Sequence, residues 1–342
     1  MTSSFEPATS PFDNTSRPGR VVILGTGGTI AGTAASADQH HAYQSAQLTV
    51  QDLVAAVPTL SGVALEPEQV AQVDSKDMSV QVWVTLCKRI VHHLERPDVA
   101  GIVVTHGTDT LEETAMFLHL ALGSKVADRP VVLTAAMRPA TSSQADGPQN
   151  LADAVAVARW REARGVLAVM AGQVWHGSDV RKVHGHRIDA FTGGDAPPLA
   201  RVSQGHPTAL RSWPEPRSPH GSGEFAMPAH WDQPTYQPTY QPALWPWVEI
   251  VTSHAGAVDK GVRACVAAGV KGLVVAGTGN GSVHHTLEQA LNDAQASGVV
   301  VWRTTRCVTG GWVSEDQEGC AWTPAQARVA LQWHLMTQSE PA

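Results

Sequence analysis

The sequence predicts an α/β protein of two domains, in which the larger N-terminal domain holds a doubly wound, mostly parallel sheet with helices on both faces. Three observations predict this fold. Apolar runs with the length of buried strands alternate with segments of helical periodicity. The 342 residues are enough for about two domains. A proline-rich stretch interrupts the alternation, so a smaller C-terminal α/β domain is expected after it.

Composition excludes several classes of protein. The chain has 24 Lys and Arg against 31 Asp and Glu, a net charge of −7, and no long basic run. Nucleic acid is therefore not an expected partner, because neutralising phosphates requires clustered basic residues. The first 20 residues lack an apolar signal segment and no later run reaches the ~18 apolar residues of a membrane span, so we expect no membrane partner and a cytoplasmic location. The scattered cysteines are expected to be reduced packing residues: Cys87, Cys265, Cys307 and Cys320.

Four segments are expected along the chain. Residues 1–20 are rich in Ser, Thr and Pro and predict a disordered arm. Residues 21–202 form the N-terminal α/β domain. Residues 203–246 predict a linker, because proline is frequent and the tandem QPTYQPTYQP interrupts any periodicity. Residues 247–342 form the second domain. Buried strands are expected in the first domain at 21–24, 101–105, 131–133 and 166–170.

Helix starts are marked by capping residues. Thr49 with Asp52 three residues later is typical of a capping box, and Ser79 precedes a long run with helical spacing. The remaining helices are expected at residues 110–122, 149–164, 258–268, 283–296 and 324–335.

A glycine-rich turn follows the first strand in the segment VVILGTGGTIAG. A dinucleotide fingerprint would require glycine where Ile30 stands, and a Walker loop would require a lysine that the segment lacks. A nucleotide-binding module is therefore disfavoured, although it stays an alternative. Two interpretations of Thr29 remain: its side chain caps the turn, or its hydroxyl is a nucleophile presented at the carboxyl end of the strand.

A second strand ends in the same way, in GIVVTHGTDTLEE. Thr108, Asp109 and Thr110 follow the strand and lead into a helix whose first turn carries Glu112 and Glu113. Asp109 or Thr110 would serve as an N-cap in the structural interpretation. In the functional interpretation, a hydroxyl and a carboxylate lie together at the edge of the sheet where ligands bind.

These motifs resemble those of the bacterial L-asparaginase family. The resemblance is carried by TGGTIAG at 26–32, THGTDT at 105–110 and AAMRP at 135–139, and it extends from about residue 21 to residue 335 through DSKDM, ADGPQNL, SDVRK and GTGNG. The motifs are closer to the family's exported, type II branch. The resemblance implies the two-domain α/β fold, an amidohydrolase activity and no cofactor.

The resemblance also implies the roles of individual residues. Thr29 corresponds to the nucleophile and Tyr43 to its partner on a flap formed by residues 33–47. The other residues implied in catalysis or substrate binding are Thr108, Asp109 and Lys182 as the second catalytic group, Ser75 and Asp109 as the residues that hold the α-carboxylate and α-ammonium of the substrate, and Gly28 and Ala135 as further substrate contacts.

The chemistry has a physical basis beside the resemblance. A threonine hydroxyl is too weakly acidic to attack a carboxamide unaided, so Tyr43 or Lys182 must take its proton. Lys182 is a base only when it is neutral, which burial favours and the nearby carboxylate of Asp109 opposes. The sequence leaves that choice open. Backbone N–H groups of the glycine-rich loops are candidates to stabilise the oxyanion.

Some features depart from the family or stand apart from it. A neighbouring subunit contributes an Asn and a Glu to each site in the family, but Gly256 stands at the Asn position here, and Glu315 and Glu318 are the candidates for the Glu. Trp245 and Trp247 predict packing between domains or subunits. No metal site is expected from the 16 histidines, and the following are expected on the surface: His40, His41, His92, His93, His184, His186, His284 and His285.

The sequence therefore predicts an L-asparaginase that converts L-asparagine and water to L-aspartate and ammonia through an acyl-enzyme on Thr29. We expect a homo-oligomer, dimer or tetramer, from the resemblance alone. Two alternatives stay open: a glutaminase-asparaginase of broad specificity, because one methylene separates the two substrates, and an amino-acid-binding sensor without turnover.

Overall fold

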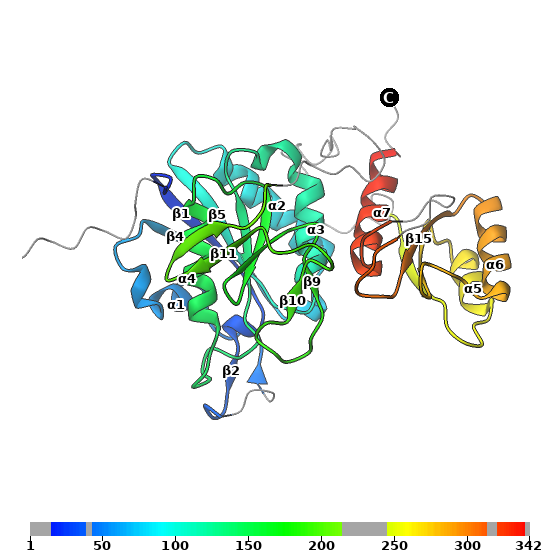
Figure 1. The fold of residues 1–342 in the computed structure, drawn as a ribbon, viewed down its shortest axis with the longest axis horizontal. Coiled ribbons are helices and arrows are strands. Elements are labelled where there is room, and N and C mark those ends of the chain that lie inside the picture. Colours follow the sequence, from blue (N-terminus) through cyan, green and yellow to red (C-terminus); the bar gives the residue numbers. More distant parts are fainter. Residues whose placement is uncertain (1–14, 39–42, 214–244, 313–319, 339–342) are drawn as a thin grey trace, which may run out of the picture.

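The computed structural model describes residues 15–38, 43–213, 245–312 and 320–338. A larger lobe and a smaller lobe lie side by side (Figure 1). The larger lobe contains an eight-stranded sheet with the order β12-β11-β8-β7-β6-β5-β1-β4. In chain order its strands are β1 (Arg20–Gly27), β4 (Leu65–Val73), β5 (Val99–Thr105), β6 (Val131–Thr134), β7 (Val166–Met170), β8 (Gln173–His176), β11 (Ala200–Ser203) and β12 (His206–Ala209).

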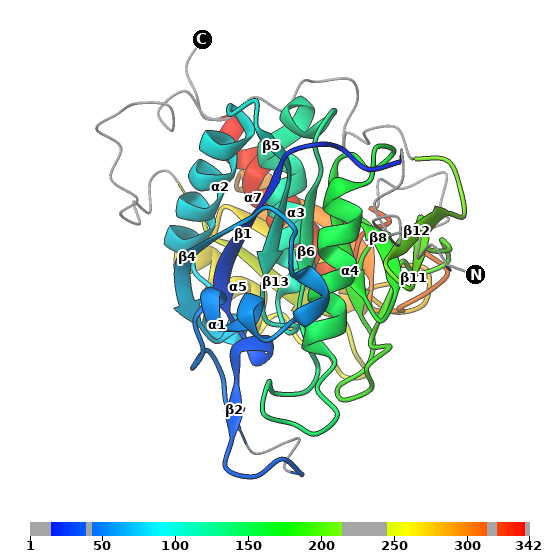
Figure 2. The ribbon, with the colours of Figure 1, turned by 90° about the vertical axis from the view of Figure 1, so that its left-hand side faces the viewer.

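The sheet is parallel from β4 to β7 and antiparallel beyond it. Alternate residues of its strands fill two different cores, because successive side chains point to opposite faces. Val22 and Leu24 pack with α2 (Val80–Leu94) and α3 (Leu111–Leu122). Val21 and Ile23 pack with α1 (Val50–Ala55) and α4 (Gly147–Arg159) on the other face (Figure 2). The predicted fold, a mostly parallel sheet covered on both faces, is confirmed.

The predicted helix caps are confirmed at two positions. Thr49 and Asp52 form a reciprocal capping box at the start of α1, and the side chain of Ser79 accepts a hydrogen bond from the backbone of Val82 in α2. The end of α4 was predicted at residue 164, which is five residues too late. The helix stops at Arg159 because Trp160 adopts extended backbone angles and its ring is buried.

Three segments differ from the sequence-based expectation. β4 was not expected, because Glu66, Glu68 and Gln69 mask its strand pattern, yet it pairs with β1 along the edge of the sheet. β12 lies within the stretch expected as linker and pairs with β11. The described part of the expected arm also packs on the domain. The guanidinium of Arg17 donates hydrogen bonds to backbone carbonyls just after α4, at 2.8 Å for Arg161 and 2.9 Å for Ala163.

The smaller lobe is a three-stranded parallel sheet with helices against it. Its strands are β13 (Val248–Thr252), β14 (Gly272–Gly277) and β15 (Val300–Thr305), and its helices are α5 (Lys260–Ala267), α6 (His285–Ala296) and α7 (Pro324–Gln338). α7 lies between the two lobes (Figure 1). Trp333 and Met336 belong to the core of the larger lobe, whereas Ala327 and Leu331 pack on β13 and β14. One helix therefore contributes to both cores.

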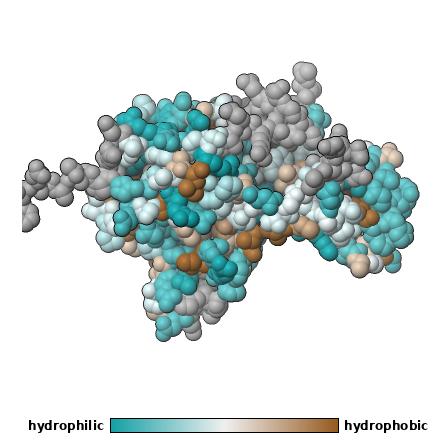
Figure 3. All heavy atoms as spheres, viewed as in Figure 1, coloured by the Kyte–Doolittle hydropathy of each residue, from teal (hydrophilic) through white to brown (hydrophobic). Residues whose placement is uncertain are grey.

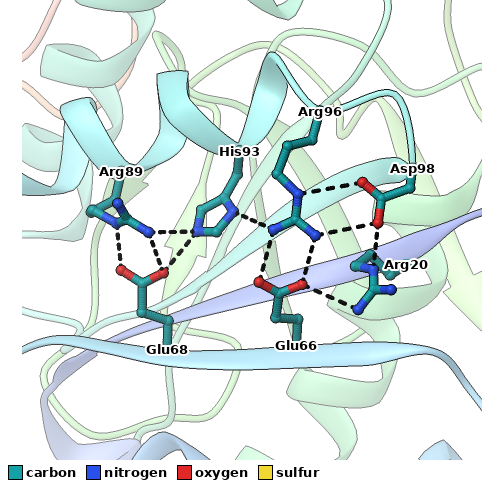
Figure 4. A network of polar contacts seen from close by, with 7 residues as sticks. All are labelled: Arg20, Glu66, Glu68, Arg89, His93, Arg96 and Asp98. Atoms are coloured by element: carbon teal, nitrogen blue, oxygen red, sulfur yellow. Dashed lines mark hydrogen bonds and ion pairs between the residues drawn. The ribbon is translucent and has the colours of Figure 1, made fainter.

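A charged network joins the edge strand to α2 (Figure 4). Arg89 donates to Glu68 at 2.6 Å, and Arg96, just after the helix, donates to Glu66 at 2.8 Å. The hydrogen bond from Arg89 holds the pKa of the Glu68 carboxyl below its usual range. His93 contacts Glu68 at 2.7 Å and is 2% exposed, so its expected surface position was wrong. Charged side chains on an edge strand also protect it from pairing with another sheet.

The distribution of hydrophilic and hydrophobic residues on the surface is typical of a globular protein whose lobes share an interface. The face in Figure 3 is hydrophilic over most of both lobes, and hydrophobic residues reach the surface at the hollow between them. No helix in the described ranges is long and apolar enough to cross a membrane. Cys87 is buried as expected, whereas Cys307 is exposed.

The predicted role of Trp245 in packing between the lobes is confirmed, since it is 3% exposed and its ring lies 6.0 Å from Phe117. Trp247 is 39% exposed. Phe117 also stacks on Trp83 at 5.0 Å and meets Trp333 of α7 edge-on at 6.0 Å. This aromatic cluster is the point where α2, α3 and α7 meet.

We expect Phe117→Ala to lower the free energy of unfolding by about 3–5 kcal/mol, because it opens a cavity among three tryptophans that cannot close over it. Urea denaturation followed by tryptophan fluorescence measures the change. The control is Val258→Ala, at a side chain that is 56% exposed, where a change within about 0.5 kcal/mol is expected. A loss below about 1 kcal/mol for Phe117→Ala would contradict this account of the interface.

Candidate active site

Thr29 lies where β1 ends, at the carboxyl edge of the parallel sheet. Gly27 and Gly28 have φ angles of 103° and 81°, so the chain turns sharply there, in a conformation that favours glycine. Thr29 then opens a short 3₁₀ turn, Thr29–Ala31. Its Oγ1 lies 2.8 Å from the hydroxyl of Tyr43, and the side chain is 7% exposed. The side chain therefore pairs with a phenol instead of capping the turn.

Tyr43 reaches Thr29 from a small hairpin. β2 (Thr33–Ala34) and β3 (Tyr43–Gln44) pair antiparallel, with Ala34 opposite Tyr43. Gly32 packs so closely on Tyr43 that an added Cβ would lie 3.0 Å from its Cδ2. The expected flap is thus a β-hairpin in its described part, and its tip lies outside the described residues.

The structure also brings together the second predicted group, which consists of Thr108, Asp109 and Lys182. Lys182 lies on β9 (Arg181–Lys182), and its Nζ donates to Thr108 Oγ1 at 2.9 Å and to Asp109 Oδ1 at 2.5 Å. The backbone N–H of Asp109 donates to Ser75 Oγ at 3.2 Å. Thr110 stands at the N-cap position of α3, but its hydroxyl donates to the Ser75 carbonyl at 2.7 Å instead of capping the helix. These contacts build one polar cluster from three separate segments of the chain.

Two glycines join the groups around Thr29 and Thr108. β1 and β5 are parallel neighbours, with Gly25 opposite Thr105. A Cβ on Gly28 would lie 2.3 Å from the Cα of Gly107. The two turns therefore touch at the residues that immediately precede the two threonines, and any side chain there would force them apart.

The ion pair at Lys182 has a chemical consequence. Asp109 is 56% exposed on the side-chain scale, whereas Lys182 is 18% exposed. A charged ammonium donates hydrogen bonds and has no lone pair to accept a proton. In this arrangement Lys182 donates to both Thr108 and Asp109, and the carboxylate of Asp109 stays largely exposed.

His106 supports this loop from the buried side. Its Nδ1 donates to the Gly107 carbonyl at 2.7 Å, and its Nε2 accepts from Thr114, which itself accepts from Trp83 Nε1 at 2.8 Å. These partners require the neutral imidazole with its proton on Nδ1. Complete burial lowers the pKa of His106 to about 4. Sequence reasoning assigned His106 no role, although it stands inside the THGTDT motif.

Glu112 also joins the site, which sequence reasoning did not predict. One of its carboxylate oxygens accepts the backbone N–H of Lys182 at 2.9 Å. Burial raises the pKa of Glu112 to about 7, with the carboxyl of Glu113 adding to the rise. The sequence signal was only its place in the first turn of α3, which equally suits an acidic residue that stabilises the helix dipole.

Two predicted substrate contacts have other partners for their backbone groups. The N–H of Gly28 donates to Val73 O at 2.9 Å, so this glycine shapes the turn instead of offering a donor. The N–H of Ala135 contacts the Met170 sulfur, and its carbonyl accepts from Asn150 at 2.9 Å. The backbone groups of Ala135 therefore bond to Met170 and Asn150 and to none of the other predicted site residues.

The remaining candidates lie apart from this cluster or outside the description. Gly256 has a φ of 70°, and nothing lies within 4 Å of an added Cβ. Glu315 and Glu318 fall outside the described residues. The rings of His184 and His186 meet edge-on at 4.5 Å. No group of three or more His, Cys, Asp or Glu side chains suited to a metal is found in the described ranges.

Comparison with known families agrees with this geometry. Residues 20–215 match the family description "Asparaginase, N-terminal", and residues 247–342 match "Glutaminase/Asparaginase C-terminal domain". The chain belongs to the asparaginase family. The family recognised from the motifs is thereby confirmed.

Individual relatives cover most of the chain. It is 37% identical over 333 residues to L-asparaginase 2 of Escherichia coli (strain K12), covering 94% of this chain and 90% of that protein. It is 38% identical over 301 residues to a glutaminase-asparaginase of Pseudomonas fluorescens biotype A, covering 87% and 78%. A crystal structure of a probable cytoplasmic L-asparaginase from Campylobacter jejuni superposes with a TM-score of 0.81 at 32% identity, covering 94% and 97%.

The buried His106 should make stability depend on pH. The pKa of His106 is about 4 in the folded protein, below the ordinary histidine value of 6.5. Between these two pH values the unfolded chain therefore binds a proton that the folded chain does not bind. Stability is complete above pH ~6.5 and falls as the pH falls towards ~4. Between pH 7 and pH 5 the free energy of unfolding of the wild type should therefore fall by roughly 2 kcal/mol more than that of His106→Gln. Urea denaturation at both pH values measures this difference, and parallel losses would contradict it.

Proposed function

We propose that this protein hydrolyses L-asparagine to L-aspartate and ammonia through an acyl-enzyme on Thr29. The observation that carries the proposal is the 2.8 Å contact between Thr29 Oγ1 and the Tyr43 hydroxyl, beside the cluster of Thr108, Asp109 and Lys182. Membership of the asparaginase family supports the same chemistry. The relatives include proteins named L-asparaginase and glutaminase-asparaginase.

The first half of the reaction uses Thr29 as nucleophile. Its Oγ1 forms a bond to the side-chain carbonyl carbon of asparagine as its proton leaves towards the oxygen of Tyr43. The C–N bond then breaks as Tyr43, having taken the Thr29 proton, passes on its own proton to the departing nitrogen, so that ammonia leaves and an ester remains on Thr29. Tyr43 is the better candidate for the first proton because it contacts Thr29 directly, whereas Lys182 contacts Thr108 and Asp109. Because Thr29 is β-branched, it loses fewer χ1 states than serine would in reaching this geometry.

The second half returns the enzyme to its starting state. A water molecule attacks the ester, the bond to Thr29 Oγ1 breaks, and aspartate leaves while the hydroxyl regains its proton. Thr108 and Lys182 are the groups we assign to orienting this water and stabilising the developing negative charge. In its ion pair with Asp109, Lys182 can stabilise this negative charge but cannot accept a proton.

Substrate recognition falls to Ser75 and Asp109. The exposed carboxylate of Asp109 pairs with the α-ammonium group, and Ser75, held beside it by the Asp109 N–H, binds the α-carboxylate. Both groups lie next to Thr108, so the substrate's backbone end is anchored on the β5 side while its amide reaches towards Thr29. Positioning of this kind converts binding energy into rate.

We also propose a homo-oligomer, a dimer or tetramer, and a cytoplasmic location. The structural neighbour from Campylobacter jejuni is titled a probable cytoplasmic L-asparaginase. A relative from Haemophilus influenzae that is 35% identical is named a probable periplasmic L-asparaginase. Sedimentation of the purified protein tests the first proposal, and fractionation of the source cells tests the second.

Removing the nucleophile should abolish turnover. We expect Thr29→Val to lower kcat for asparagine by about 10³-fold or more, because no group replaces the attacking oxygen. Thr108→Val should cost about 10²-fold through the second step. Ammonia release measures both, and Thr208→Val, at an exposed position on the edge strand β12, is the control. Turnover that persists in Thr29→Val would overturn the proposal, and asparagine binding by a wild type without ammonia release would indicate the sensor.

Substrate preference separates the asparaginase from the broad-specificity alternative. One methylene distinguishes the two amides and is worth only about 1–3 kcal/mol in a pocket, or 10- to 200-fold in rate. We expect kcat/KM for asparagine to exceed that for glutamine by at least about 10-fold. Ammonia release from each amide by the same preparation measures the ratio, and equal values would identify a glutaminase-asparaginase.

A further inference from the structure

The strand that carries Lys182 has little structure of its own. β9 contains two residues, and its partner strand β10 (Phe191–Thr192) is equally short, with Phe191 opposite Lys182. So short a ladder does not hold a side chain in place unaided. The position of Lys182 must therefore come from contacts outside the hairpin.

Three such contacts hold three successive residues. Gln326 Nε2 donates to the Val180 carbonyl at 2.8 Å, and this bond is buried. The Arg181 guanidinium donates to the Val308 carbonyl at 2.9 Å. The N–H of Lys182 donates to the carboxylate of Glu112 at 2.9 Å. The first two contacts come from the C-terminal domain, although every proposed catalytic residue belongs to the N-terminal domain.

Gln326 is held in turn by the start of α7. Its backbone N–H donates to Thr323 Oγ1 at 3.1 Å, and its side-chain oxygen accepts the N–H of Thr323 at 3.1 Å, which is a reciprocal capping box. The capping box therefore reaches the segment that carries Lys182 through the side chain of Gln326.

Burial of the Gln326 side chain restricts it to this set of hydrogen bonds. Gln326 is 0% exposed, and its side chain uses its oxygen within the cap and its NH₂ group on Val180. A buried amide is costly unless it is satisfied, so the side chain has one favourable position. Two residues further along α7, Arg328 pairs with Glu113 at 2.9 Å, which fixes the helix against α3.

We propose that the capping box of α7, through Gln326 and together with Glu112, positions Lys182 for catalysis. Gln326 and Glu112 are positioning residues that act on the backbone of residues 180–182 and do not touch the substrate. The C-terminal domain thereby sets the geometry of the Lys182–Thr108 contact. This inference rests on the role of Lys182 under the proposed function.

The first test compares two glutamines on the same helix. Gln332 is also buried and also donates to a backbone carbonyl, but its acceptor, Pro246 at 2.9 Å, is not part of the segment that carries Lys182. We expect Gln326→Met to lower kcat by about 10- to 100-fold with KM within about 2-fold, because a displaced catalytic group affects rate before binding. Gln332→Met should leave both constants within about 2-fold of wild type. Equal kcat values for the two variants would overturn the proposal.

Conservative variants at Gln326 and Glu112 distinguish a lost hydrogen bond from a lost fold. Gln326→Glu keeps the oxygen that accepts from Thr323 but lacks the N–H that Val180 accepts, so near pH 8 it should lose kcat as Gln326→Met does. Glu112→Gln keeps an acceptor for the Lys182 N–H and should retain kcat within about 2-fold, whereas Glu112→Met should lose about 10-fold. Retained kcat in Glu112→Met, or an equal loss in Glu112→Gln, would contradict positioning through this bond.

A double-variant cycle separates this inference from the proposed function. If Gln326 acts through Lys182, adding Gln326→Met to Lys182→Met should change kcat by less than about 2-fold, although each alone lowers it. Full additivity would overturn the positioning role and leave the role of Lys182 standing. A Lys182→Met protein that keeps its full kcat would instead overturn the role proposed for Lys182, and the inference with it.

Discussion

The close approach of two parallel strand ends is the constraint on which the site depends. β1 and β5 are hydrogen-bonded neighbours, and their turns meet where an added Cβ on Gly28 would lie 2.3 Å from the Cα of Gly107. Thr29 and Thr108 follow these glycines directly. A parallel sheet places both strand ends on one edge, and the absence of side chains at the two glycines then lets the turns that carry the threonines touch.

The chain supports this edge from the face of the sheet that α2 and α3 cover. Behind β5, His106 hydrogen-bonds to Thr114, which accepts a hydrogen bond from Trp83, and these bonds connect the THGTDT loop to the aromatic cluster around Phe117. That cluster includes Trp333 of α7, so the helix that fills both cores lies against the same support. The stability of the interface and the geometry of the site thus depend on shared contacts.

Much of the fold follows from local sequence, and the exceptions have physical reasons. The central strands were predictable because their apolar runs are buried on both faces. β4 was missed because the same strand carries Glu66 and Glu68, which are satisfied by arginines of another element. His93 was predicted on the surface because it is a polar residue near the end of a helix. The same ion-pair network buries it.

The sequence by itself determined the alternation of strands and helices, the caps at Thr49 and Ser79, and, through its motifs, the family. The same motifs supplied the candidate site residues Thr29, Tyr43, Thr108, Asp109, Lys182 and Ser75. These signals lie within a few neighbouring residues, so local patterns carry them. Only the tertiary structure decided which of these side chains touch. Lys182 contacts Thr108 across 74 positions, and Gln326 contacts Val180 across 146. Such contacts form when separate elements pack together, which no local pattern specifies.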